Sequence, residues 1–209
     1  EPFGDVASLN VFRIAAAARA QGKKVLLSGT GGDEVFGGYR RHVALMAERY
    51  WAWAPRPVRA GVAAGARRLP PGNVLIRRIR KALSNAHMSA EDRMLAYSRW
   101  IAPEMSLSLM EAEHRDTLSG THVGHGMAKT LGRSGSERSA LGRMLYLDSK
   151  HFLADFNHTY SDKMSMAAGV EVRVPFCDPD LAETAATLSD TLKVRGREGK
   201  YALKKIMEK

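Results

Sequence analysis

Apolar residues recur every three or four positions along most of this chain, a pattern that predicts a mostly α-helical fold. The first stripe predicts a helix that Ser8 caps and Gly22 ends. A second stripe is expected to face the core, and its members are Tyr39, Val43, Met46, Tyr50 and Trp53. Ser89 and Asp92 can form a capping box at the start of a further helix.

Two segments depart from this periodicity. Val25 to Leu27 is short and apolar, and it predicts a buried strand of a parallel sheet whose other strands lie mostly upstream. Residues 116–136 are rich in Gly, Ser, Thr and His, which predicts a loop. Helices should resume afterwards, and Asp178-Pro179 is typical of a helix start.

No apolar run approaches the ~20 residues that a membrane span needs, so no membrane partner is expected.

The predicted strand leads into a glycine-rich segment, Ser28 to Tyr39. Its three glycines within five residues let a ligand approach the backbone, a layout typical of a nucleotide site at the carboxyl end of a strand. It matches neither the dinucleotide fingerprint nor a P-loop. Asp33 follows the glycines, and an acid there repels phosphate unless Mg²⁺ lies between them, which makes it a candidate metal ligand. On residue types alone, a solvated Asp-Glu pair at a helix start is an equally good interpretation.

Four blocks resemble the glutamine-dependent asparagine synthetases. Ser28 to Tyr39 is similar to their second ATP-site motif, Ser-Gly-acid-Gly-small-Asp-Glu-hydrophobic-Phe-Gly-Gly-Tyr. Asp162 to Asp178 resembles their Asp-Arg-Met-Ser-Met-Ala and Glu-Ala-Arg-Val-Pro-Phe-Leu-Asp segments, and Gly199 to Tyr201 resembles their Gly-Lys-Tyr. Glu1 to Asp5 is similar to their Asp-Glu-Pro-Phe-x-Asp piece. The blocks occur in the family's order, while residues 50–135 carry little of the likeness.

The resemblance implies an α/β synthetase domain of the ATP-pyrophosphatase type, also described as adenine nucleotide α-hydrolase-like. Residues 1–209 would be the later, C-terminal part of this domain, mostly α-helical with one or few parallel strands. The family's first ATP-site loop, Ser-Gly-Gly-x-Asp-Ser, and the N-terminal cysteine of its glutaminase domain do not occur in this sequence. We therefore expect a fragment whose N-terminal glutaminase domain and first ATP-site loop lie outside the chain, and which is inactive alone.

The family's chemistry assigns roles by position. In these ligases of asparagine biosynthesis, the side-chain carboxylate of aspartate attacks the α-phosphate of ATP to give β-aspartyl-adenylate and pyrophosphate. Ammonia released from glutamine then displaces AMP. The resemblance implies that Ser28, Gly29 and Gly31 bind ATP, that Asp33 holds Mg²⁺, and that the catalytic Lys200 stabilises charge at the phosphates. Without the resemblance, Lys200 would be interpreted as the first lysine of a basic helix.

Thr30 departs from the family pattern, which has Glu or Asp at this position. The acid is thought to matter for forming the adenylate and handling the amine. A threonine hydroxyl can form hydrogen bonds, but near pH 7 it cannot act as a general base. Thr30 is thus a catalytic position that puts the acid substrate in question, and a carboxylate-adenylating amide synthetase for another acid or amine, of the β-lactam- or macrocycle-forming type, stays open.

The distribution of charge along the chain allows a second hypothesis, in which the chain binds nucleic acid and is not an enzyme. The net charge is +10, and no acid occurs between residues 49 and 90. The cations of this stretch are Arg49, Arg56, Arg59, Arg67, Arg68, Arg77, Arg78, Arg80 and Lys81. We interpret them as a solvated basic face, with a helical nucleic-acid-binding module as the competing hypothesis.

Cysteine content and composition complete the expectations. Cys177 is the single cysteine, which excludes an internal disulfide and fits a reducing, cytoplasmic location. No histidine is close to it in the sequence to activate it, so we expect a small packed thiol.

The expected partners are small molecules (aspartate or another acid, and ammonia from glutamine) and the glutaminase domain, and a homodimer is also open.

Overall fold

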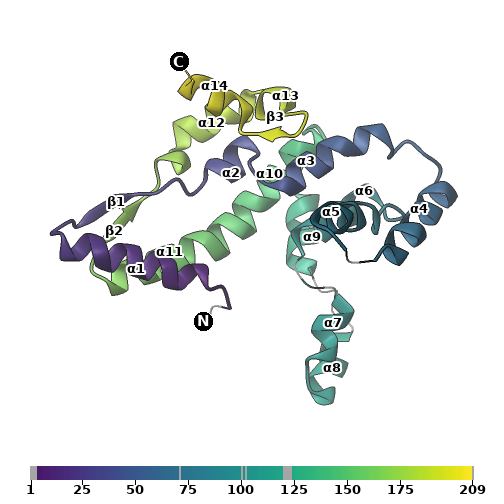
Figure 1. The fold of residues 1–209 in the computed structure, drawn as a ribbon, viewed down its shortest axis with the longest axis horizontal. Coiled ribbons are helices and arrows are strands. Elements are labelled where there is room, and N and C mark those ends of the chain that lie inside the picture. Colours follow the sequence, from purple (N-terminus) through teal and green to yellow (C-terminus); the bar gives the residue numbers. More distant parts are fainter. Residues whose placement is uncertain (1–3, 71, 100, 102, 120–123, 209) are drawn as a thin grey trace. The chain divides into compact units, whose positions relative to one another are not determined.

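The computed structural model describes residues 4–70, 72–99, 101, 103–119 and 124–208, and the chain divides into two compact units (Figure 1). One unit joins the two ends of the sequence, Glu1–Tyr39 and Ser136–Lys209, and the other is the middle segment Arg40–Gly135. Both units are mostly helical, as the hydrophobic periodicity predicted. Glu1, Pro2 and Phe3, which begin the first family-like block, lie outside the described residues.

Helices and two short sheets make up the first unit. Its elements are α1 (Ala7–Ala20), β1 (Val25–Leu27), α2 (Gly32–Phe36), α10 (Ala140–Leu147), the π-helix η2 (Asp148–His158), α11 (Thr159–Ala167), β2 (Glu171–Arg173), the 3₁₀ turn η3 (Pro175–Cys177), α12 (Pro179–Thr187), α13 (Asp190–Lys193), β3 (Val194–Arg195), β4 (Glu198–Gly199) and α14 (Tyr201–Met207). Helix α1 packs along α11, and α11 packs in turn against η2 and β2 (Figure 1).

A parallel pair of strands places the glycine-rich segment. β1 has the bounds that the sequence predicted, and Leu26 pairs with Val172 of β2. The prediction that this strand is buried was wrong, because Val25 and Leu27 are 42% and 75% exposed. The expectation that its partners lie mostly upstream was incomplete, because this neighbour comes from far downstream. The second sheet pairs β3 with β4 in antiparallel fashion, so the described strands are not all parallel as expected. Gly196, at φ +61°, allows the tight turn between these two strands.

In the first unit, the helix start predicted at Asp178 is confirmed, and the cap predicted at Ser8 is wrong. Asp178 caps α12, because its side chain accepts a hydrogen bond from the Leu181 amide (3.1 Å). Ser8 does not cap α1, contrary to the prediction. The side chain of Asp5 instead accepts the Ala7 amide hydrogen bond at 2.8 Å, and Ser8 is buried inside the helix. Asp5, which lies two residues before Ala7, thus takes the capping role that the sequence assigned to Ser8.

The core of the first unit is formed largely by α10 and the helix that continues it. Leu141, Met144 and Leu147 are fully buried. After them the chain enters η2, an eleven-residue π-helix, where Phe152 and Phe156 stack at 5.4 Å between ring centroids. π-Helices are rare and are frequent at functional sites, so the presence of η2 indicates that a functional site lies near it.

The second unit contains α3 (Arg40–Ala47), the 3₁₀ turn η1 (Glu48–Tyr50), α4 (Arg56–Arg68), α5 (Val74–Leu83), α6 (Ala90–Ser98), α7 (Pro103–Ser108), α8 (Ala112–Ser119) and α9 (His125–Gly132). The predicted capping box is confirmed, since the Asp92 amide donates to Ser89 Oγ (3.1 Å). The predicted loop over residues 116–136 was wrong in part, because α8 and α9 extend into it. Tyr50 and Trp53 are 67% and 79% exposed, so the stripe that they end does not face the core along its whole length.

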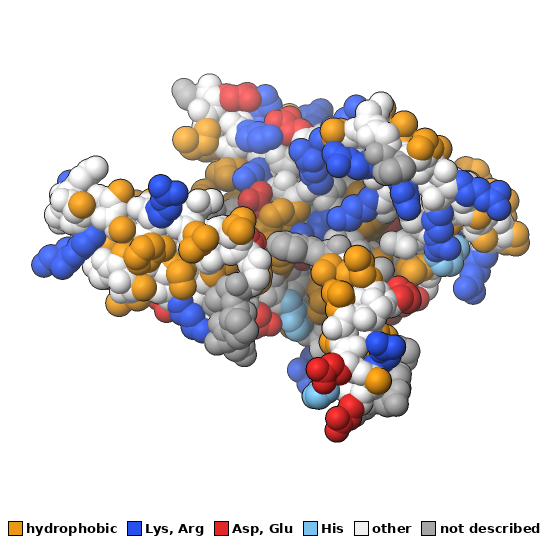
Figure 2. Space-filling view, turned by 60° about the horizontal axis from the view of Figure 1, so that its bottom comes forward, with side chains coloured by type: hydrophobic (Ala, Val, Ile, Leu, Met, Phe, Trp, Pro, Cys, Tyr) orange, Lys and Arg blue, Asp and Glu red, His pale blue; other side chains and the backbone are white. Residues whose placement is uncertain are grey.

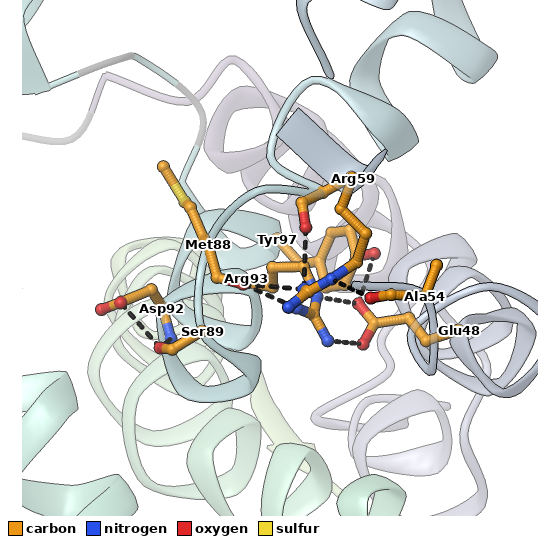
Figure 3. Close-up of polar contacts among 9 residues, drawn as sticks. Glu48, Ala54, Arg59, Met88, Ser89, Asp92, Arg93 and Tyr97 are labelled. Carbon is orange, nitrogen blue, oxygen red and sulfur yellow. Dashed lines mark hydrogen bonds and ion pairs between the residues drawn. The ribbon is translucent and has the colours of Figure 1, made fainter. Parts of the chain in front are cut away.

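A buried ion pair ties the second unit together. Arg93 of α6 donates two hydrogen bonds to the carboxylate of Glu48, at 2.9 and 2.6 Å, and Tyr97 donates a third at 2.8 Å (Figure 3). Arg59 of α4 reaches the carbonyl oxygens of Ala54 and of the segment before α6. These contacts join η1, α4 and α6 through satisfied polar groups, as buried charges require.

Two arginines of the basic stretch therefore have structural partners. Besides Arg59, Arg67 donates to the carbonyl oxygen of Ser84 at 3.0 Å, which fastens α4 to the end of α5. Figure 2 shows further Lys and Arg side chains spread over the surface of this unit. Within the described part of the chain, no helix is both long and apolar enough to cross a bilayer.

Candidate active site

The residues after β1 form a tight turn against the end of β2. The Ser28 amide donates to the carbonyl oxygen of Arg173 at 2.8 Å, which continues the parallel ladder by one step. Ser28 Oγ then lies 2.7 Å from Thr30 Oγ1 and accepts the Thr30 amide at 3.2 Å. The Gly32 amide closes the turn onto the carbonyl oxygen of Gly29. Two predicted site residues, Ser28 and Thr30, are therefore in direct contact.

Gly31 occupies a position that accepts no other residue without strain. Its φ is +94°, in the left-handed region, and a Cβ added there would lie 2.5 Å from Cys177 Sγ. Helix α2 starts immediately afterwards and ends at Gly37, which is also left-handed (φ +76°). The glycines of the motif thus serve a sharp turn and a close approach of two segments.

Asp33 and Lys200, the predicted metal ligand and the predicted catalytic lysine, form an ion pair. Lys200 Nζ lies 3.0 Å from Asp33 Oδ1, and the two side chains are 33% and 35% exposed. Lys200 has φ +54°, the only positive value for a non-glycine residue in the described chain. It precedes α14, as the sequence predicted. Such a conformation persists only where the surroundings enforce it.

The backbone next to Lys200 approaches the end of α2 closely. A Cβ on Gly199 would overlap the carbonyl oxygen of Gly37, and a Cβ on Gly38 would overlap the Asp33 carboxylate. The Gly-Gly pair after α2 therefore makes room for β4 on one side and for Asp33 on the other. The backbone segments that carry Asp33 and Lys200 are therefore packed closely together.

Glu34 fixes α2 to the π-helix. It is 1% exposed, and its Oε1 accepts hydrogen bonds from the Tyr39 hydroxyl (2.6 Å) and from Asn157 Nδ2 (2.8 Å). Burial, then the hydrogen bond from Tyr39 to Glu34, raises the pKa of Tyr39 well above its ordinary value. Sequence reasoning did not single out Asn157, because no local pattern marks a residue of η2 as a neighbour of α2.

A cysteine and a histidine meet beside the turn. Cys177 Sγ is 3.4 Å from His158 Nε2 and 3.8 Å from the carbonyl oxygen of Thr30. The sequence-based expectation that no histidine lies near Cys177 was wrong, because His158 ends η2 and the fold brings that end to η3. Burial, and after it the charge of Glu34, raises the pKa of the Cys177 thiol. The thiol therefore keeps its proton near neutral pH, which does not favour a nucleophile.

A cavity of about 400 Å³ opens next to this histidine. Its lining includes the polar or charged residues His158, Asp162 and Lys163 and the apolar residues Val172 and Val174. Val174 directly follows β2, so the cavity borders the carboxyl end of the sheet, as does the Ser28 turn. Side chains of both charges and an apolar wall in one space suit a small polar organic molecule.

The whole chain matches the family model described as Asparagine synthase, over residues 1–209. The chain belongs to the asparagine synthase family. Among curated relatives, glutamine-hydrolyzing asparagine synthetases of Mycobacterium tuberculosis and Mycobacterium bovis are 29% identical to it over 213 residues. Asparagine synthetase (glutamine-hydrolyzing) 1 of Bacillus subtilis is 26% identical over 208 residues. Each alignment covers all of this chain.

The chain covers less than a third of the length of these asparagine synthetase relatives. The chain spans 30% of the length of the mycobacterial relatives and 31% of that of the Bacillus relative. No solved structure is significantly similar to the chain. Sequence similarity establishes the family. The contacts within the site are those of the structure of this chain.

Three of the family-like blocks meet in this structure. The Ser28–Tyr39 block supplies the turn and Asp33, and the Gly199–Tyr201 block supplies Lys200. The Asp162–Asp178 block contributes β2, Cys177 and four of the residues that line the cavity, namely Asp162, Lys163, Val172 and Val174. All the residues that the sequence assigned to ATP, metal and catalysis therefore lie in the first unit, on the turn after β1, on α2 or at the start of α14.

Proposed function

We propose that a protein containing this chain forms an amide bond in two steps that use ATP. A carboxylate of the acid substrate attacks the α-phosphorus of ATP, so a carboxyl–phosphate bond forms and pyrophosphate leaves. An amine, ammonia released from glutamine, then attacks the acyl carbon, AMP leaves, and the nitrogen loses a proton. Family membership and the names of the relatives support this reaction class.

The contact between Asp33 and Lys200 is the observation on this chain that best supports the proposed function. Ser28, Gly29 and Gly31 form a turn with a closely approachable backbone, and we assign them to ATP. Lys200 is the cation beside this turn, and we assign it to the charge that develops on the phosphates. A lysine held 3.0 Å from Asp33 also neutralises that carboxylate, so the turn can accept a polyphosphate.

The same contact changes the argument for a metal. Asp33 has a cationic partner within the chain, so its position beside phosphate no longer requires Mg²⁺. Within the described residues, no group of three or more Asp, Glu, His or Cys side chains could hold a metal ion. A single, partly exposed carboxylate does fit an Mg²⁺ that keeps phosphate and water ligands. We therefore propose Asp33 as its protein ligand; the ion would supply further neutralisation of phosphate charge.

Pyrophosphate–ATP exchange tests this function in the protein of the relatives' length. We expect exchange that depends on an acid substrate, and a loss of at least ~100-fold in Asp33→Asn, the size of effect of removing a strong electrostatic contact from an active site. Partial recovery at high Mg²⁺ would support the metal role. Exchange that Asp33→Asn leaves unchanged would contradict it and return Asp33 to a structural role.

Thr30 directs the choice of acid. The structure pairs its hydroxyl with Ser28 and shows no carboxylate at this position, so we propose that aspartate is a poor substrate and that another acid is adenylated. If so, Thr30→Glu lowers exchange with the true acid, because a new carboxylate repels the substrate carboxylate. Activity kept or raised with aspartate in Thr30→Glu would contradict this. The assay compares both forms on aspartate, glutamate and their N-acetyl derivatives.

We also propose that the 209 residues alone do not complete an ATP site. The domain that the relatives' length allows for would supply a second phosphate-binding loop of the ATP-pyrophosphatase type, and a glutaminase domain would supply ammonia in the cytoplasm. Calorimetry of the isolated chain with ATP and Mg²⁺ should show no measurable binding. Micromolar affinity would contradict the proposal.

A further inference from the structure

One chemical task in the proposed reaction has no residue assigned to it. In the amide-forming step the attacking nitrogen forms a bond to the acyl carbon and must release one proton. The Thr30 hydroxyl cannot accept that proton near neutral pH, because it would have to be deprotonated first. A side chain that accepts this proton within hydrogen-bonding reach of the reacting nitrogen would speed the step.

His158 connects the turn to the cavity. Its Nε2 is 3.4 Å from Cys177 Sγ, the sulfur is 3.8 Å from the Thr30 carbonyl oxygen, and the histidine also lines the cavity of about 400 Å³. It lies where η2 continues into α11, and η2 packs against α2. Imidazole is the side chain that enzymes use most often as a general base.

The thiol determines which ring nitrogen can act. Cys177 has one proton, and the contact to the Thr30 carbonyl oxygen is one in which the sulfur donates. With the thiol proton directed to that oxygen, the sulfur accepts from His158 Nε2, and Nδ1 then keeps its lone pair. Asp162 and Lys163 line the same cavity and are the charged groups that face this space.

We propose that His158 accepts the proton that the amine loses during amide formation, in place of the acidic residue that this family has at the position of Thr30. The carbon–nitrogen bond forms, the bond to AMP breaks, and the proton passes from nitrogen to the imidazole and then to water. His158 has no part in the first step, which releases no proton from an amine. This inference rests on the proposed two-step function.

The two half-reactions separate this role from a structural one. The protein of the relatives' length is assayed for pyrophosphate exchange and for amide formation with ammonium chloride, using the acid that gives the most exchange. In His158→Gln we expect exchange within ~3-fold of wild type and amide formation reduced at least ~100-fold, the usual size of general-base catalysis. Imidazole added to His158→Ala should restore part of the amide formation.

Matched variants make the result decisive. His151→Gln changes a histidine of the same π-helix that pairs with Asp155, and it should alter neither half-reaction. Asp162→Asn removes the other potential proton acceptor of the cavity wall, and a selective loss of amide formation there but not in His158→Gln would overturn the inference. Unchanged amide formation in His158→Gln would also overturn it, as would equal loss of both half-reactions without rescue by imidazole. Absence of exchange in the wild-type protein would instead contradict the proposed function.

Discussion

Lys200 Nζ lies 3.0 Å from Asp33 Oδ1, although the two residues come from opposite ends of the sequence. The backbone segments that carry the two residues also approach each other closely, since Gly199 lies against Gly37 and Gly38 lies against the Asp33 carboxylate. A cation and a carboxylate placed by packed segments suit electrostatic stabilisation of a developing charge, which requires charged groups that are positioned before the reaction.

We expect Lys200→Ala to lower pyrophosphate exchange by at least ~100-fold in the protein of the relatives' length, because it removes the cation beside the turn. Stability should change little, since alanine and lysine are similarly strained at this backbone conformation. Lys204→Ala is the control, because Lys204 of α14 forms an exposed ion pair with Glu198 of β4. Equal losses in the two variants would contradict a specific role for Lys200.

Gly31→Ala should destabilise the chain by about 2 kcal/mol or more, measured by urea unfolding. The substitution forces alanine into a left-handed conformation and places its Cβ 2.5 Å from Cys177 Sγ. Gly65→Ala serves as the opposite control, because Gly65 is inside α4 with nothing within 4 Å of an added Cβ. That change should stabilise the helix by up to about 1 kcal/mol. A neutral Gly31→Ala would show that the turn is not held as described.

Glu48→Gln should destabilise the second unit by about 3–5 kcal/mol, because it leaves the buried Arg93 without its charged partner. Thermal unfolding followed by circular dichroism measures the effect. The control is Glu171→Gln, which breaks the exposed pair with Arg173 and should cause no measurable change. Similar shifts in both variants would contradict the importance of burial for this ion pair.

Alkaline pH should destabilise the fold through two tyrosines. Burial and nearby carboxylates raise the pKa of Tyr39 and of Tyr97 above their ordinary value of 10.0, whereas in the unfolded chain both ionise near that value. Above pH 10 the unfolded state therefore binds fewer protons than the folded state, so stability falls as pH rises. Urea midpoints measured from about pH 9 to 11 should fall less steeply in Tyr97→Phe. An unchanged slope would contradict the shift.

The sequence determined the chemistry-bearing segments and much of the local structure. Val25–Leu27 is a strand with the predicted bounds, Ser89 and Asp178 cap the predicted helices, and Lys200 precedes a helix as expected. These features depend on interactions between near neighbours, such as a side chain capping an amide three residues away, so a local pattern is enough to reveal them.

Tertiary structure alone decided which of these segments meet. Nothing in the local pattern places Lys200 against Asp33, Asn157 against Glu34, or His158 against Cys177. The same limit explains the errors, since the cap of α1 and the exposure of Trp53 depend on competing side chains and on what packs nearby. Long-range contacts arise when packing buries separate segments together, and a one-dimensional pattern records the apolar face of a segment but not the partner that covers it.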